Sequence, residues 1–177
     1  TRIRAWMPRT SAATAADALL GLRVLLADDQ PLFRDGLHNL LAARGIQVVG
    51  LAADGAEAVH KAQALQPDVV IMDINMPVLD GIAATEQIKQ ALPQIKVLVL
   101  TVAETDDKLM EALRRGASGY LLKNLDAQTL FTMLERLHAG ETVLTPAMAT
   151  HLVGHFVGGR AGTVPLLSER QQQVLHL

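Results

Sequence analysis

Short apolar runs alternate with amphipathic segments from residue 22 onward. Runs such as VVIM and VLVL are apolar at consecutive positions, which is typical of strands buried on both faces of a sheet. The predicted strands are 22–27, 46–52, 68–72, 96–101 and 118–122. The predicted helices are 31–45, 55–66, 81–92, 105–116 and 126–140. The alternation predicts an α/β fold with a five-stranded parallel sheet covered by helices on both faces.

The residues before this region have a different composition. Residues 1–21 are rich in Ala and Thr and carry three arginines. Chain termini are commonly loose, so we interpret 1–21 as a poorly ordered N-terminal extension. A short helix over 12–20 is the alternative interpretation.

The residues after Gly140 indicate a linker that contains a helix. Thr145 can cap that helix, and Pro146 suits its first position. The glycines and proline that follow suggest a flexible joint ending near residue 165. We therefore expect a linker over 141–165 and a further helix within 166–177.

Composition and charge narrow the class of protein. Sixteen Lys and Arg against eighteen Asp and Glu give a net charge of −2, and no basic block indicates nucleic-acid binding. The chain has no Cys, which excludes disulfides and zinc–thiolate sites and is compatible with a reducing compartment. No apolar run approaches the roughly 20 residues of a membrane span. We expect a cytoplasmic protein that does not bind membranes.

Polar side chains stand where the predicted strands end. Asp28 and Asp29 follow the first strand, Asp73 follows the third, Thr101 ends the fourth and Lys123 follows the fifth. Ligands of an open parallel sheet bind beyond the carboxyl ends of its strands. We therefore expect these five side chains to lie close together at one edge of the sheet.

The chemistry of this group favours a cation and an anion bound side by side. Three converging carboxylates repel one another unless a cation lies between them. A small number of oxygen ligands suits Mg²⁺, which keeps several waters and accepts phosphate oxygens. Lys123 adds a mobile positive charge that can pair with an anion. The residues thus predict a site for Mg²⁺ and a phosphoryl group.

Four motifs in order carry a resemblance to the receiver domain of response regulators. They are LLADDQPLFRDGL, PDVVIMDINMPVLDG, VLVLT and GASGYLLKN, within 22–140. With LTPAMATHLV and LLSERQQQVLHL behind them, the chain resembles the NarL/FixJ subfamily, whose C-terminal half is a LuxR-type helix-turn-helix domain. The resemblance implies a flavodoxin-like (CheY-like) sheet of order 2-1-3-4-5.

The resemblance also implies a domain plan. Residues 22–140 would form the receiver, and 166–177 would be only the start of the helix-turn-helix domain. The recognition helix that reads bases would then be missing. We therefore do not expect this fragment alone to bind promoter DNA specifically.

The resemblance assigns the phosphoryl chemistry to four residues. Asp73 would be the phosphoacceptor, taking a phosphoryl group from a sensor histidine kinase or a small phosphodonor. Lys123 and the Thr101 hydroxyl would contact the phosphoryl oxygens, and Tyr120 would turn inward as Thr101 moves. Beyond this self-phosphorylation and autodephosphorylation, the chain would not be an enzyme.

The resemblance assigns the metal to four positions. Asp29, Asp73 and the Asn75 main-chain carbonyl would hold Mg²⁺, and Asp28 would act mainly through water. Positioning and charge neutralisation provide most of the catalysis in such transfers. Phosphorylation would switch a two-state element and drive homodimerisation, either through residues 105–138 or through the first and fifth helices, and the sequence leaves both surfaces open.

Three positions depart from common family residues or tune the site. Gln30 stands where this subfamily often has His, and Asn124 follows Lys123 where receivers at large more often have Pro. Ala103, two residues after Thr101, is small, and we expect it to leave the acyl phosphate relatively open to water.

Simpler interpretations exist for single residues. Asp28 and Asp29 could cap the helix that starts at Pro31. Asp73 could be a turn residue, Lys123 a solvated charge and Tyr120 an ordinary packing residue. Joint placement at strand ends argues against all of these, since convergent polar groups mark sites.

Other functions also fit parts of the pattern. A Mg²⁺-dependent phosphatase with a strand-end Asp nucleophile would need an acid at position 75, which is Asn. A receiver could act as a protein-interaction module without phosphorylation. His151 and His155 have a spacing that can grip zinc, but without an evident third ligand we interpret them as surface or interface residues.

Overall fold

The computed structural model describes residues 18–102 and 105–158. The strands are β1 (Arg23–Ala27), β2 (Gln47–Ala52), β3 (Val69–Asp73), β4 (Lys96–Thr101), β5 (Gly119–Leu122) and β6 (Val143–Leu144). The helices are α2 (Pro31–Ala43), α3 (Gly55–Leu65), α4 (Gly81–Ala91), α5 (Asp106–Arg114), α6 (Ala127–His138) and α7 (Pro146–Gly158). Every predicted strand and helix of the receiver region is present, and the helix predicted after Thr145 is α7. None of the described helices is long and apolar enough to cross a membrane.

The sheet is parallel with the order β2-β1-β3-β4-β5-β6. The predicted order 2-1-3-4-5 is confirmed, but the prediction of five strands is wrong, because the described residues form six. The extra strand pairs Gly119 with Val143, and the Val143 N–H donates to the Ser118 carbonyl at 3.0 Å. Two residues are too few to show a strand pattern in sequence. β6 nevertheless covers the edge that β5 would otherwise expose.

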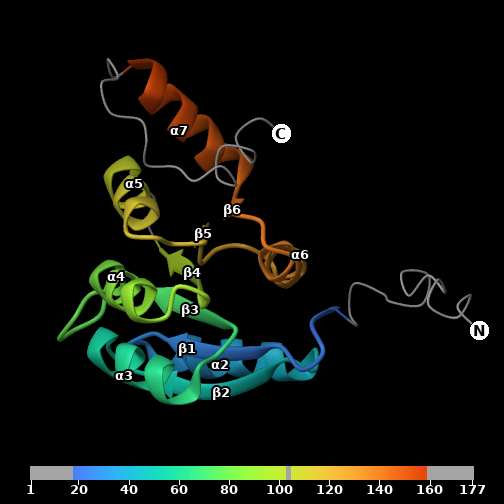
Figure 1. The fold of residues 1–177 in the computed structure, drawn as a ribbon. Helices are drawn as coiled ribbons and strands as arrows, with labels where there is room; N and C mark the ends of the chain where they lie inside the picture. The colour runs from blue at the N-terminus through green and yellow to red at the C-terminus, as the bar shows by residue number, and fades with distance from the viewer. Residues whose placement is uncertain (1–17, 103–104, 159–177) are drawn as a thin grey trace, which may run out of the picture.

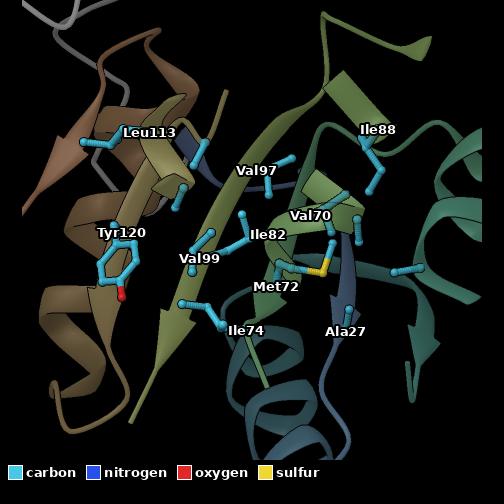
Figure 2. Packing of buried hydrophobic residues seen from close by; sticks show 14 of the residues in the cluster. Ala27, Val70, Met72, Ile74, Ile82, Ile88, Val97, Val99, Leu113 and Tyr120 are labelled. Atoms are coloured by element: carbon cyan, nitrogen blue, oxygen red, sulfur yellow. The ribbon is translucent and has the colours of Figure 1, made fainter. Parts of the chain in front are cut away.

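Successive strand residues point to opposite faces of the sheet, and each face has its own helices. We call one the four-helix face, because residues of α3, α4, α5 and α7 pack there, and the other the two-helix face, covered by α2 and α6. Figure 2 shows part of the four-helix face, where Val70, Met72 and Val99 of the strands lie beside Ile82 of α4. The sheet core is therefore apolar on both sides, as the consecutive apolar runs predict.

Capping side chains set the starts of several helices. Asp54 accepts a hydrogen bond from the Glu57 N–H at 2.8 Å, and Glu57 in turn accepts from the Ala53 N–H at 2.9 Å. Asp54 therefore caps α3, and Glu57 also binds the main chain of the residue before the cap. Thr145 caps α7 as predicted, because its Oγ1 accepts from the Met148 N–H at 3.3 Å.

Helix α7 packs on the rest of the fold. Leu144, Met148 and Leu152 are buried in the cluster of the four-helix face, and Figure 1 shows α7 beside α5. The described part of the predicted linker is therefore part of the packed unit. At the other end, Leu19 of the predicted extension is fully buried on the two-helix face. The predictions for residues 1–17 and 159–177 lie outside the described residues.

Candidate functional site

Strand register brings the predicted site residues to one edge of the sheet. Ala27 pairs with Met72, so Asp28 follows β1 next to Asp73 at the end of β3. Thr101 pairs with Leu122 on β5, and the Lys123 N–H donates to the Thr101 carbonyl at 2.7 Å. The carboxyl ends of β1, β3, β4 and β5 thus place the predicted residues around one site.

Three carboxylates form the acidic part of this site. One oxygen from each of Asp28, Asp29 and Asp73 lies within 4.8 Å of the others. Asp28 and Asp73 are each 5% exposed, whereas Asp29 is exposed to solvent. The buried pair faces the core side of the site, and Asp29 provides a carboxylate on its solvent side.

The interpretation of Asp28 and Asp29 as helix caps is wrong. The N-cap position of α2 is Gln30, and no side chain caps this helix. Asp28 Oδ1 accepts from the Gln30 N–H at 2.8 Å, and the Asp28 carbonyl accepts from Arg34 at 2.8 Å. These contacts hold the Asp28 segment in place while its Oδ2 faces the site.

Lys123 lies within the carboxylate group. Its Nζ is 2.6 Å from Asp28 Oδ2 and 3.4 Å from Asp73 Oδ2, and its side chain is only 6% exposed. The same Nζ lies 4.5 Å from the centroid of the Phe33 ring. The interpretation of Lys123 as a solvated surface charge is therefore wrong.

The pKa of Asp73 is raised to about 6, mainly by burial and next by repulsion from Asp28, while the nearby Lys123 ammonium opposes both effects. The site therefore holds a carboxylate whose charge is costly until additional positive charge is present. A divalent cation bound by the three carboxylates would supply that charge, so this donor set fits a hard cation.

The loop between β3 and α4 closes tightly over the end of β3. The Gly81 N–H donates to the Ile74 carbonyl at 2.8 Å, and a Cβ atom at residue 81 would lie 1.9 Å from the Asp73 main-chain oxygen. Asn75 is exposed, and its Oδ1 accepts from Lys108 Nζ of α5 at 3.2 Å. The loop therefore holds the Asp73 backbone in place and presents Asn75 at the mouth of the site.

Thr101 and Tyr120 are buried behind the site. Thr101 is 1% exposed, and Tyr120 is fully buried with the cluster of the four-helix face (Figure 2). Tyr120 is thus already inside the fold in this structure. Ala103 lies outside the described residues.

Sequence reasoning missed two residues that contact the site. Phe33 lies beside Lys123, and Lys108 reaches Asn75. In the sequence, Phe33 is one apolar residue of an amphipathic helix and Lys108 one charge of another. Neither has a spacing signal, because each contact depends on where two distant elements meet.

His151 contacts α5 instead of joining a metal cluster. Its Nδ1 lies 3.0 Å from Asp106 Oδ1, and both side chains are about half exposed. Nothing is described for the side chain of His155. Over residues 18–102 and 105–158, the carboxylates of Asp28, Asp29 and Asp73 form the one group of three or more candidate metal ligands. His151 is therefore an interface residue between α7 and α5, as predicted.

Receiver domains form a class defined by a doubly wound parallel sheet. The strands of that sheet carry acidic residues, a hydroxyl and a lysine at their carboxyl ends. The chain belongs to the response regulator receiver domain family, whose model matches residues 24–135. It is 40% identical over 136 residues to the transcriptional regulatory protein LnrK of Bacillus subtilis (strain 168). That alignment covers 76% of this chain and 62% of LnrK, less than two thirds of the relative's length.

Solved structures of receivers agree with this assignment. A LuxR-family two-component response regulator from Aurantimonas sp. SI85-9A1 has a TM-score of 0.73 and 33% identity, covering 77% of this chain and 99% of that chain. The isolated REC domain of RcsB from Salmonella enterica serovar Typhimurium, determined with the phosphomimetic BeF₃⁻, has a TM-score of 0.67 and 26% identity, covering 74% and 98%. The predicted resemblance to LuxR-type response regulators and the CheY-like fold are confirmed. The chain is a two-component receiver, and receiver domains bind Mg²⁺ at an acidic pocket.

Proposed function

We propose that Asp73 is the phosphoacceptor of a phosphorylation-activated transcription regulator, whose donor is the phosphohistidine of a sensor histidine kinase. The observation that carries this proposal is the juxtaposition of Asp73 with Asp28, Asp29 and Lys123 at the end of β3. We place the protein in the cytoplasm, and the absence of Cys is compatible with that compartment.

The transfer is a displacement at phosphorus. An Asp73 carboxylate oxygen forms the new O–P bond of an acyl phosphate while the N–P bond of the phosphohistidine breaks. The imidazole nitrogen keeps the bonding electron pair and takes a proton from solvent. Lys123 moves from Asp28 and Asp73 to the incoming phosphoryl oxygens, and the Thr101 hydroxyl donates to another of these oxygens.

Two carboxylates and one main-chain carbonyl are the proposed direct ligands of Mg²⁺. Asp29, Asp73 and the Asn75 carbonyl would hold the ion, and Asp28 would act mainly through water. The bound ion supplies positive charge to the carboxylates and the phosphoryl oxygens. The burial of Asp73 holds its carboxylate at the edge of the apolar core, in a fixed position for the transfer.

Intact-mass spectrometry after incubation with acetyl phosphate and Mg²⁺ tests the acceptor. We expect wild-type protein to gain one phosphoryl group and Asp73→Asn to gain none. Asp35→Asn, a matched change at an exposed carboxylate on α2, should be labelled like the wild type. No labelling of the wild type, under conditions that label another receiver, would instead favour a phosphorylation-independent interaction module.

Phosphorylation would be read out by homodimerisation. An apolar hollow of about 280 Å³ lies between α2 and α6, and Leu32 at its lining is 89% exposed. These features favour a dimer surface formed by α2 and α6, the first and fifth helices of the receiver. The alternative surface, which spans residues 105–138 and does not include α2, is less favoured. A C-terminal helix-turn-helix domain, whose start 166–177 resembles, would then bind promoter DNA as a dimer.

Light scattering with and without beryllofluoride tests the dimer surface. Leu32→Glu should keep the protein monomeric when beryllofluoride is bound. Val157→Glu, an equally drastic change at an exposed residue of α7, should dimerise like the wild type. Loss of dimerisation in Val157→Glu alone would place the surface elsewhere.

A further inference from the structure

We propose that Phe33 is a positioning residue for Lys123, and that its ring face keeps the ammonium group at the phosphorylation site. The proposal starts from one contact, the 4.5 Å between Lys123 Nζ and the centroid of the Phe33 ring. This distance lies within the range in which an aromatic face attracts a cation. The inference deepens the proposed function, because its rate measurement rests on Asp73 accepting a phosphoryl group.

The Phe33 ring is uncharged, whereas the other partners of Lys123 are carboxylates. Nζ contacts Asp28 Oδ2 and Asp73 Oδ2, and both carboxylates are proposed to take on new partners when a cation and a phosphoryl group arrive. The attraction of the ammonium to these carboxylates is then weakened. The Phe33 ring carries no charge and is no ligand of a cation, so neither the cation nor the phosphoryl group competes with Lys123 for it.

The position of Phe33 is set by the same segment that carries Asp28. Phe33 lies in the first turn of α2, where the Arg34 N–H donates to the Gln30 carbonyl at 3.0 Å and the Arg34 guanidinium donates to the Asp28 carbonyl at 2.8 Å. The ring also packs against the cluster of the two-helix face. Ring, carboxylate and ammonium are therefore held as one unit, and a long flexible lysine is ordered before the phosphoryl group arrives.

The test compares substitutions at Phe33 with a change elsewhere in the same hollow. Phe33→Leu keeps an apolar side chain but removes the aromatic face, and Phe33→Tyr restores it. Leu40→Ala removes apolar packing from the same hollow and serves as the control. With acetyl phosphate, we expect Phe33→Leu to slow phosphorylation by roughly three- to tenfold, with Phe33→Tyr and Leu40→Ala near the wild-type rate.

A cycle with Lys123→Met shows whether Phe33 acts through the lysine. If it does, adding Phe33→Leu to Lys123→Met causes no further slowing. An equal slowing in both backgrounds would overturn the proposal, as would an unchanged rate in the Phe33→Leu single variant.

Nuclear magnetic resonance measures the contact without any phosphorylation. The ring current of Phe33 should move the Lys123 Hε resonances upfield in the full chain, and Phe33→Leu should abolish this displacement while Leu40→Ala leaves it in place. Hε resonances that stay put in Phe33→Leu would overturn the proposal. If the wild type takes up no phosphoryl group, the proposed function fails, and the ring-current result still decides whether Phe33 positions Lys123.

Discussion

The two faces of the sheet are built from side chains of different size. On the four-helix face the buried helix residues mix small and large side chains, and the small ones are Ala58, Ala62, Ala84 and Ala112. On the two-helix face the buried helix residues are all large, namely Leu37, Leu41, Leu130, Phe131, Leu134 and Leu137. Small residues let helices approach the sheet closely, whereas α2 and α6 leave a hollow between them. The two-helix face therefore has space beside the site.

The faces also contribute different parts of the phosphorylation site. Phe33 reaches Lys123 from α2 on the two-helix face. Tyr120 and the tightly closed loop at Gly81 belong to the four-helix side, next to α4 and α5. If this contrast is correct, substitutions should be costly on the four-helix face and tolerated near the hollow.

Gly81→Ala should have the largest effect. The added Cβ would collide with the Asp73 main-chain oxygen, and a backbone atom cannot rotate away as a side chain can. We expect a loss of more than about 4 kcal/mol in the free energy of unfolding, or failure to fold. Urea denaturation measures it, and a loss below about 1 kcal/mol would show that the loop has room.

Met148→Ala should have the next largest effect. Met148 is a fully buried residue of α7, so its truncation leaves a cavity on the four-helix face. We expect a loss of about 2–3 kcal/mol and faster amide hydrogen exchange confined to α7 and α5. Val157→Ala, at an exposed position of the same helix, is the control. Unchanged exchange in Met148→Ala would mean that α7 does not depend on this contact.

Asp73→Asn tests the site at the carboxyl ends of the strands, to which both faces contribute. The pKa of folded Asp73 is about 6, above the ordinary value of 3.8, so the folded state binds more protons between these pH values. Without Mg²⁺, wild-type stability should therefore fall as the pH rises from about 4 to 6, and Asp73→Asn should lack this fall. Above pH 6 the variant should be more stable by on the order of 1–2 kcal/mol. Parallel pH profiles of the two proteins, measured by urea denaturation, would contradict this.

Gly36→Ala should have the smallest effect, and it should be stabilising. Gly36 lies within α2 at the hollow, and nothing lies within 4 Å of the added Cβ. Alanine favours a helix interior over glycine by about 0.5–1 kcal/mol, so the variant should be more stable by that amount. Thermal denaturation of Gly36→Ala and Gly81→Ala, measured in parallel, compares the two faces directly. A destabilised Gly36→Ala would remove the contrast between them.

Hydrophobic periodicity was sufficient to predict most of the fold, because most of its helices and strands are long and strongly patterned. The consecutive apolar residues of β3 and β4 reflect burial on both faces, and the helices between them keep a clear apolar stripe. β6 escaped detection because two residues carry no period. Its pairing depends on where α6 returns the chain, which is a tertiary property.

The candidate site was predictable to the extent that it follows strand ends. Asp28, Asp73 and Lys123 each stand directly at or after a strand terminus, so parallel topology alone brings them together. Contacts of Phe33 and Lys108 could not be predicted in this way. They depend on the tilt of α2 and α5 relative to the sheet, which no short sequence pattern encodes.

The short strand β6 determines where a receiver domain of this kind can be joined to another domain in a chimeric protein. A chimera joined after Gly140 would lack β6, whose main chain pairs with β5, and would lose the side chains of Leu144, Met148 and Leu152 from the core. Its exposed β5 edge would be open to pairing with other chains. A fusion joint placed beyond α7 keeps the edge covered, so the transferable unit is longer than the receiver motifs alone indicate.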